Sequence, residues 1–425
     1  MSLPAPDAAL EVAATIGFGI ARKAIWSGER CSWLEAYPVM PGQNPAVSAM
    51  CGADVYGGTA GIGWFLAEAA IRTGDPLLLR TARAALRQAA ARAAQQVASA
   101  PHGFYGGAAG AGAVLAVAGQ RLGDEESLSA GRALLLDCPT GTEDPFATDI
   151  ISGLAGTVVA FVLAAGALGG DAALLGRASD AAAALIERGE RDAAGGLSWA
   201  SMADRRANLT GFGHGAAGIA HALLLLDAAA PQDELREAAG AAFAYERGLF
   251  DPVQGNWPDF RIMPGYSSDQ VYFPVAWCHG AAGIAQGRLP AAAAGFALDA
   301  DLAAGIAATM REAQRALHSP GSDFTLCHGV LGLADMLWDA VRAGRTEGAG
   351  IVEACAAYAI RAFHEAERPW PSGLLTREEI SGLMMGNAGI GWFFLRLADP
   401  TLESVLAPGA ALIAQAGGGS VARTG

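Results

Sequence analysis

Two kinds of segment alternate along almost the whole chain. Segments rich in Ala, Leu, Arg and Glu carry their charges on one face, a pattern typical of amphipathic helices. Each is followed by an almost wholly apolar segment, such as 62–72 or 390–397, which predicts a buried helix. Strand-like alternation is scarce, so the pattern predicts an all-α protein. The predicted amphipathic helices are 8–27, 76–99, 125–137, 171–188, 232–247, 298–318 and 351–366.

The apolar segments open on one repeated motif, G-x-x-G, and each interval between copies has room for two helices. Glycine lets the backbone turn sharply and lets helix ends approach closely near an axis. Seven helix pairs without a polar capping repeat favour a closed seven-fold α/α toroid, with residues 1–425 as one domain. An open α-solenoid uses the same helix pairs and is the alternative. The seven copies are 58–61, 107–110, 153–156, 215–218, 280–283, 329–332 and 386–389.

One stretch, 150–170, carries no charge over 21 residues, about the length needed to span a bilayer. It contains several glycines and repeats a pattern found elsewhere in the chain. We therefore expect a buried helix of a protein without transmembrane segments.

Composition narrows the class of protein further. A formal net charge of −14 argues against nucleic-acid binding, which needs clustered Lys and Arg. Six cysteines in 425 residues do not suggest a disulfide framework. The start MSLPAPDAAL lacks the features of a secretory signal. We expect a cytoplasmic location.

Candidate chemistry appears when the residues before each first glycine are aligned. In three consecutive repeats the preceding residue is His214, His279 or His328, and in two of them Cys278 or Cys327 stands one residue earlier. In a ring these groups converge at one rim. Thiolate and imidazole are preferred zinc ligands, and a catalytic zinc keeps three protein ligands and one open position. The pattern predicts a zinc site, but spacing alone leaves open whether His328 or His279 completes it.

The motifs D-I-I-S-G-L-A-G at 149–156, G-H-G-A-A-G at 213–218, W-C-H-G-A-A-G-I at 277–284 and C-H-G-V-L-G at 327–332 resemble the lanthionine synthetase C-like family. The resemblance extends from about residue 54 to 397. It implies the seven-fold toroid with zinc held by Cys278, Cys327 and His328. It further implies that His214 is the acid/base residue and that Asp149 assists it, although an aspartate just before a helix is often only an N-cap.

The family's reaction adds cysteine thiols to dehydroalanine or dehydrobutyrine and forms thioether rings. Zinc makes such chemistry accessible because a coordinated thiol is deprotonated. The resemblance therefore implies a dehydrated precursor peptide as partner. The chain has no room for a dehydratase, so a separate enzyme is expected to supply that peptide.

Some stand-alone cyclases of the family carry Tyr after the first cysteine and Arg a few residues before it. Here His279 follows Cys278, and V-Y-F-P-V-A-W precedes it without Arg. We expect His279 to lie beside the metal ligands or to face the substrate.

This departure keeps two other functions open: coupling of glutathione to dehydrated residues, and a peptide-binding scaffold with only a structural zinc. The full ligand set with His214 argues against the scaffold. A glycosidase barrel is disfavoured because the motif positions lack paired carboxylates.

The long connections before the fourth to sixth repeats, including 255–260 and 264–270, are candidates to line the entrance and hold the peptide. Trp257, Tyr266 and Tyr272 are candidate peptide contacts. Loop aromatics more often only pack the loop against the body of the protein.

Overall fold

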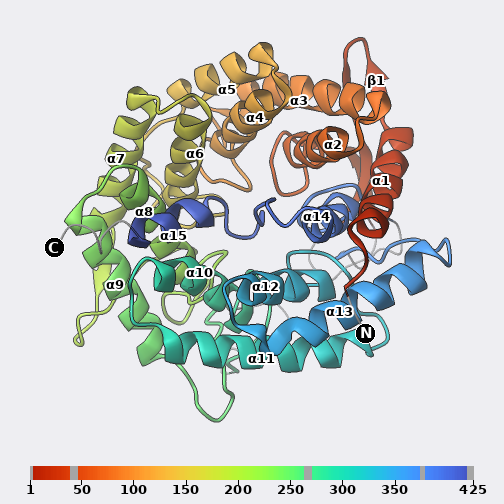
Figure 1. Cartoon of the computed structure of the whole chain (residues 1–425). Helices are drawn as coiled ribbons and strands as arrows, with labels where there is room; N and C mark the ends of the chain where they lie inside the picture. The colour runs from red at the N-terminus through yellow and green to blue at the C-terminus, as the bar shows by residue number, and fades with distance from the viewer. Residues whose placement is uncertain (1–2, 39–45, 263–269, 374–378, 419–425) are drawn as a thin grey trace.

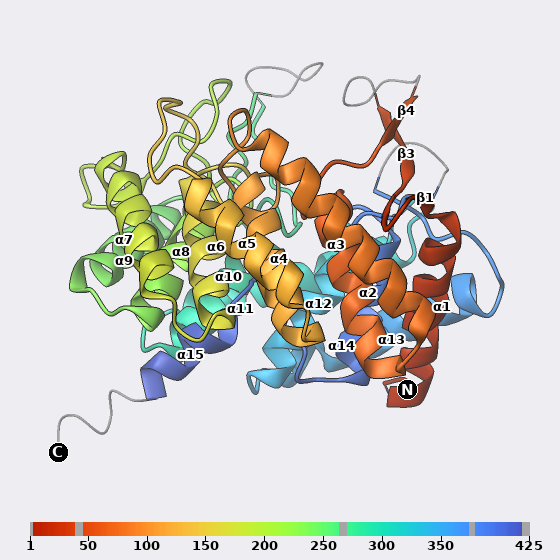
Figure 2. The same ribbon diagram turned by 90° about the horizontal axis from the view of Figure 1, so that it is seen from above.

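A computed structural model describes residues 3–38, 46–262, 270–373 and 379–418. Helices form two concentric rings (Figure 1), and the side view shows them as one thick belt (Figure 2). The inner helices are α2 (Thr59–Thr73), α4 (Ala108–Leu122), α6 (Leu154–Ala167), α8 (Ala216–Ala229), α10 (Ala281–Ala293), α12 (Val330–Arg342) and α14 (Asn387–Ala398). The outer helices are α1 (Pro6–Lys23), α3 (Pro76–Gln96), α5 (Glu125–Asp137), α7 (Ala172–Glu187), α9 (Asp233–Gly248), α11 (Asp299–Leu317) and α13 (Ala349–Ala359).

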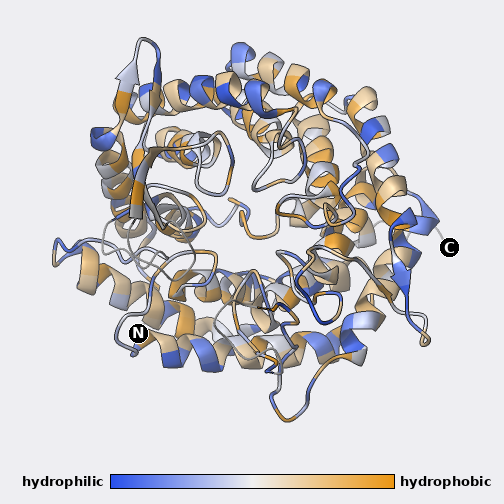
Figure 3. Cartoon of the chain, turned by 180° about the vertical axis from the view of Figure 1, so that it is seen from behind, coloured by the Kyte–Doolittle hydropathy of each residue, from blue (hydrophilic) through white to orange (hydrophobic). Residues whose placement is uncertain are grey.

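The all-α prediction is confirmed, and the inner and outer helices differ as their sequences predict. Every residue of α8 from Ala216 to Asp227 is buried, whereas α7 and α9 bury only one stripe each. The same contrast is visible in Figure 3, where blue polar residues interrupt the outer ring at regular intervals. A helix needs one apolar stripe when one side faces water and apolar residues all round when both sides are covered.

The ring is closed, so the open-solenoid alternative is wrong. The last inner helix, α14, packs against the first, α2, and also against α1. A backbone hydrogen bond of 2.8 Å from Met384 N to Tyr56 O joins the loops of the seventh and first repeats. An open solenoid would leave these two repeats apart.

Aspartate caps set the starts of three outer helices. Asp75 accepts hydrogen bonds from two backbone amides of α3, Asp171 does the same for α7, and Asp124 accepts one from α5. Most predicted boundaries agree with the structure to within a few residues. The first is an exception, because the helix predicted over 8–27 ends at Lys23 and is followed by strand β1 (Ile25–Ser27).

The few strands form three small antiparallel pairs within the described ranges. Strand β1 pairs with β2 (Arg30–Ser32), β3 (Leu34–Pro38) with β4 (Ala46–Met50), and β5 (Glu190–Arg191) with β6 (Leu197–Ser198).

The second glycine of each motif has one structural reason in all seven repeats. A Cβ at this glycine would come within 3.0 Å of the carbonyl oxygen six residues earlier, which real Cβ atoms essentially never do. In the third repeat, for example, a side chain at Gly156 would meet the carbonyl of Ile150. The loop before each inner helix therefore folds back on the first helical turn, and only glycine leaves room for it.

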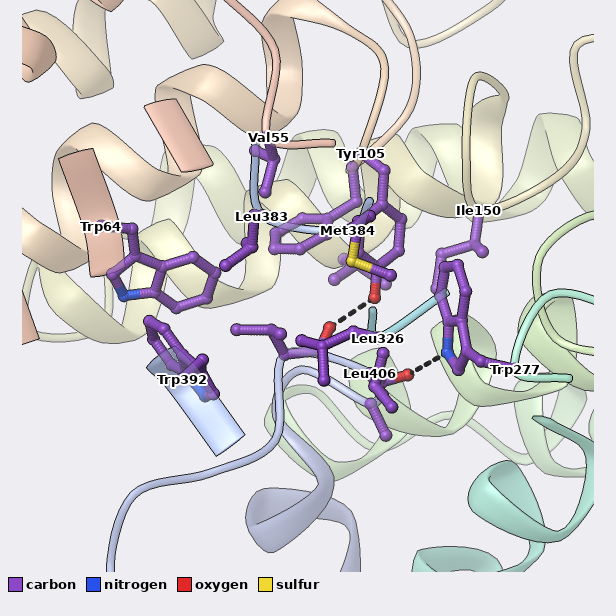
Figure 4. Close-up of a cluster of buried hydrophobic side chains, with 14 of the residues drawn as sticks. Val55, Trp64, Tyr105, Ile150, Trp277, Leu326, Leu383, Met384, Trp392 and Leu406 are labelled. Atoms are coloured by element: carbon purple, nitrogen blue, oxygen red, sulfur yellow. Dashed lines mark hydrogen bonds between the residues drawn. The ribbon is translucent and has the colours of Figure 1, made fainter. Parts of the chain in front are cut away.

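The residues that supply these seven carbonyls also form a layer of the core, part of which is shown in Figure 4. Each is at most 2% exposed. They are Val55, Phe104, Ile150, Phe212, Trp277, Leu326 and Leu383. In the fifth and sixth repeats, the two residues after this layer are Cys278–His279 and Cys327–His328.

The chain crosses the middle of the ring once more between α14 and α15 (Ala410–Gly418), as Figure 1 shows. We call residues 402–408 the axial segment. Side chains of the ring hold its backbone: Tyr105 donates to Val405 O at 2.6 Å and the Trp277 indole to Leu406 O at 2.8 Å (Figure 4). This segment lies under the layer of apolar side chains.

The uncharged stretch 150–170 forms helix α6 (Leu154–Ala167), which is interior, as predicted. Of the helices in the described ranges, none combines the length and apolar character that a membrane crossing requires.

Candidate metal centre

Backbone hydrogen bonds between neighbouring repeats position Cys278 and Cys327. Both residues precede the motif glycines of α10 and α12. Trp277 N donates to Cys327 O at 3.1 Å, and Cys327 N donates to Met384 O at 2.9 Å. On the other side, Gly213 N donates to Cys278 O at 3.0 Å. The two loops are therefore held by the repeats on either side of them.

The thiols of Cys278 and Cys327 lie close enough that each changes the pKa of the other. The neighbouring Cys327 thiol and the positive charges of His328, Arg261 and His214 lower the pKa of Cys278 against the effect of burial. The Cys278 thiol, together with burial, raises the pKa of Cys327. One sulfur of the pair is thus disposed to ionise first.

The other cysteines contrast with this pair. Burial raises the pKa of Cys31, Cys138 and Cys355 to about 12. Such thiols stay protonated and pack as small apolar side chains. Cys278 and Cys327, at the motif positions, instead lie beside each other.

His328 is held by a carboxylate. Its Nδ1 lies 3.0 Å from Asp323 Oδ2. Burial lowers the pKa of His328, but the hydrogen bond and charge of Asp323 outweigh burial, so the net shift is upward. Because Nδ1 donates to Asp323, Nε2 remains for a metal, an arrangement common among metal-binding histidines.

Two thiols and a carboxylate-held imidazole fit the donor chemistry of zinc. Their spacing is not yet that of a metal site, since no three His, Cys, Asp or Glu side chains in the described part of the chain are grouped to hold an ion. The two sulfurs are the neighbouring donors, and His328 is the candidate third donor.

Beside the thiols lies a second pair, His214 and Asp149. Nδ1 of His214 is hydrogen-bonded to Asp149 Oδ2, and Asp149 Oδ1 accepts from Ser152 N at 2.7 Å. Burial lowers the pKa of His214, but the bond to Asp149 and the charges of Asp149 and Cys278 raise it more. The N-cap alternative for Asp149 is wrong, since the cap of α6 is Gly153.

His279 does not share this arrangement. Its ring stacks on that of His214 with centroids 5.5 Å apart, and its Nδ1 lies 4.0 Å from Asp259. Burial, and then the charge of Arg261, lower its pKa, so the ring is neutral. It lies next to the centre, on the side of His214.

Four residues near the centre are absent from the predicted site residues: Asp323, Asp259, Arg261 and Tyr56. Arg261, paired with Asp259, acts electrostatically on Cys278, His214 and His279. It comes from a long connection, and no motif indicates it. Tyr56 donates its hydroxyl to Cys327 Sγ at 3.0 Å. It stands two residues before the first motif glycine, as the cysteines do, so the same alignment could have identified it.

The predicted loop contacts have different positions. Trp257 is 1% exposed, and its indole donates to Glu246 O at 2.9 Å, so it packs the loop and presents no surface to a peptide. Tyr272 is half-buried, and its carbonyl accepts from Asp259 N at 2.8 Å. Tyr266 lies outside the described residues.

Comparisons with known proteins agree with this architecture. The sequence profile of the family described as lanthionine synthetase C-like protein matches residues 49–410. Among solved structures, nisin cyclase is similar with a TM-score of 0.58 at 14% identity, over 85% of this chain and 92% of that one. A sugar epimerase from a ruminal bacterium reaches a TM-score of 0.43 at 10% identity, over 81% and 87% of the two chains. No curated protein matches by sequence.

Proposed function

The chain belongs to the lanthionine synthetase C-like family, and from this membership we propose that it is a zinc-dependent cyclase. It would add cysteine thiols of a peptide to dehydroalanine or dehydrobutyrine residues of the same peptide. The similarity in fold to nisin cyclase supports a peptide substrate. A separate dehydratase would prepare that peptide.

One observation carries the proposal: the neighbouring thiols of Cys278 and Cys327 lie beside a hydrogen-bonded His–Asp pair at one rim of the ring. Cys278, Cys327 and His328 would hold the zinc. When bound, zinc would lower the pKa of a coordinated substrate thiol and so supply a thiolate at neutral pH.

His214 is placed to complete the addition. The new carbon–sulfur bond forms at the β-carbon, and the electrons of the double bond move toward the carbonyl as an enolate. The α-carbon then needs a proton, which the free Nε2–H of a protonated His214 would donate. Asp149 holds Nδ1 and favours the charged ring. The proton lost by the thiol balances the one gained by carbon, so the reaction needs no oxidant or reductant.

The substrate has access to this acid. The His214 side chain is 27% exposed and that of His328 is 37% exposed, whereas Asp149 is only 5% exposed. The two histidines thus face the rim while the carboxylate is shielded. Coupling of glutathione would use the same groups with a thiol from outside the peptide.

A peptide carrying one dehydroalanine and one cysteine tests the proposal directly. Zinc-loaded protein, with one ion per chain, is expected to consume the thiol, as counted by alkylation and mass spectrometry. His214→Ala should keep its zinc and lose ring closure. His318→Ala, at the exposed end of α11, is the matched control and should cyclise normally.

Two further samples separate the alternatives. Cysteine-blocked peptide with added glutathione should react poorly if the thiol must come from the peptide, and a faster reaction than ring closure would favour glutathione coupling. A zinc-loaded protein that consumes neither thiol would contradict the enzyme proposal and leave the scaffold function.

A further inference from the structure

Tyr56 occupies, in the first repeat, the register position that the two cysteines occupy in the fifth and sixth. All three residues stand two places before the first motif glycine. The backbone of Tyr56 is fixed on both sides: its amide donates to Tyr105 O at 2.9 Å, and its carbonyl accepts from Met384 N at 2.8 Å. The phenol is therefore presented to the centre from a rigid loop.

The phenol of Tyr56 reaches the sulfur of Cys327, with 3.0 Å between Oη and Sγ. Cys327 is 3% exposed, so water does not compete for its sulfur. Tyr105 offers a comparison within the same fold, because it stands at the same register position in the second repeat. Its hydroxyl donates instead to Val405 O in the axial segment, at 2.6 Å. Of these two equivalent tyrosines, only one is directed at a thiol.

We propose that Tyr56 is a positioning residue for the metal centre, which donates a hydrogen bond to the ligand sulfur of Cys327. The inference rests on the proposed function, because it takes Cys327 as a ligand. Hydrogen bonds from outside the coordination sphere orient metal ligands and tune the metal, and their loss typically weakens metal binding.

The bond has two physical consequences. It fixes the side-chain rotation of Cys327, so that the sulfur stays beside Cys278. It also withdraws electron density from the sulfur, since a donor to a thiolate stabilises the negative charge. A thiolate that donates less electron density would leave a bound metal a stronger Lewis acid toward a substrate thiol. No protonation change of Tyr56 is required.

Cobalt in place of zinc reports on the ligand sulfur, because the thiolate-to-cobalt charge-transfer band absorbs in the near ultraviolet. In Tyr56→Phe this band is expected to move to lower energy, since a thiolate without a donor is oxidised more easily. Zinc affinity, measured against a chromophoric chelator, should fall roughly 10- to 100-fold. Tyr105→Phe removes an equivalent buried hydroxyl and should leave both the band and the zinc affinity unchanged.

A second substitution keeps the side-chain volume. With 3-fluorotyrosine in place of Tyr56 the phenol is a stronger donor, and the band should move to higher energy. If Tyr56→Phe and the 3-fluorotyrosine protein both keep the wild-type band and zinc affinity, the inference is overturned.

The two proposals fail in different ways. If wild-type protein binds cobalt but closes no ring, and the substitutions at position 56 shift the band, the cyclase proposal is contradicted and the positioning role stands. Normal ring closure without any effect at position 56 contradicts the positioning role alone. Wild-type protein that binds neither metal overturns both.

Discussion

Asp149 and His214 come from the loops before α6 and α8, in consecutive repeats, and their side chains are hydrogen-bonded to each other. The pair lies beside the Cys278 thiol, whose charge also acts on His214. A proton donor and a thiol pair therefore meet at the same rim, although their residues are far apart in the chain.

The first prediction concerns Asp149→Asn. Asp149 supplies the main contributions that raise the pKa of His214, and burial, the largest single effect, lowers it. Without the carboxylate the pKa of His214 falls, so the ring loses its proton at a lower pH. Ring closure at pH 7 should drop roughly 100-fold, and the alkaline limb of the pH–rate profile should move to lower pH.

Asp144→Asn is the control for this change, because Asp144 lies in the same loop but is exposed, and its carboxylate accepts from the Phe146 amide. An unaltered pH profile in Asp149→Asn would show that Asp149 does not set the charge of His214.

The second prediction concerns Asp323→Asn. Asp323 holds Nδ1 of His328 at 3.0 Å and thereby leaves Nε2 for a metal. Loss of the carboxylate should weaken zinc binding roughly 10- to 100-fold, measured by chelator competition. Asp299→Asn, at an 88% exposed side chain on α11, should bind zinc like wild type. Equal zinc affinities in both variants would show that Asp323 does not support a metal ligand.

The third prediction compares two glycines of α6. A methyl group at Gly156 would collide with the backbone of Ile150 and Phe104, whereas Gly166 has open space around it. Gly156→Ala should lower the free energy of unfolding by about 2 kcal/mol or more, since the neighbouring backbone has to move. Gly166→Ala should raise it by about 0.5–1 kcal/mol, because alanine favours a helix. Denaturant titration measures both, and equal effects would refute the steric account.

The fourth prediction concerns pH and His221. This ring is 1% exposed, its Nε2 donates to Pro408 O at 2.9 Å, and burial lowers its pKa to about 4. An unfolded chain binds the proton near pH 6.5, so the contribution to stability is complete above that pH. It is lost as pH falls toward 4, by about 2 kcal/mol between pH 6.5 and 5.

Replacement of this ring removes the titrating group. His221→Gln should therefore show a shallower loss of unfolding free energy between pH 6.5 and 5 than wild type. Urea titrations at the two pH values measure this loss. An equal loss of unfolding free energy in wild type and in His221→Gln would mean that His221 is not responsible.

Much of the fold follows from local patterns. The period of apolar residues and the good helix formers place the helices, and aspartates such as Asp75 and Asp171 mark where two outer ones begin. The glycine repeats predict the number of helix pairs. Alignment of the motifs also singles out Cys278, Cys327 and His214, whose approach to one rim needs only that the repeats form a ring.

The remaining features depend on contacts between distant repeats. Asp149 by itself resembles a helix cap, and its bond to His214 exists because the third and fourth repeats pack side by side. Arg261 reaches the centre from a loop with no motif, and Tyr56 reaches Cys327 only because the ring closes.

Sequence by itself determined the helices, the seven repeats and the candidate ligand types, because periodicity and backbone sterics act over a few residues. Tertiary structure alone decided which side chains meet, because ring closure places the first repeat beside the last. The axial segment then lies beneath the layer of apolar side chains. Hydrogen bonds across that closure, such as Tyr56 to Cys327, have no local signature in the chain.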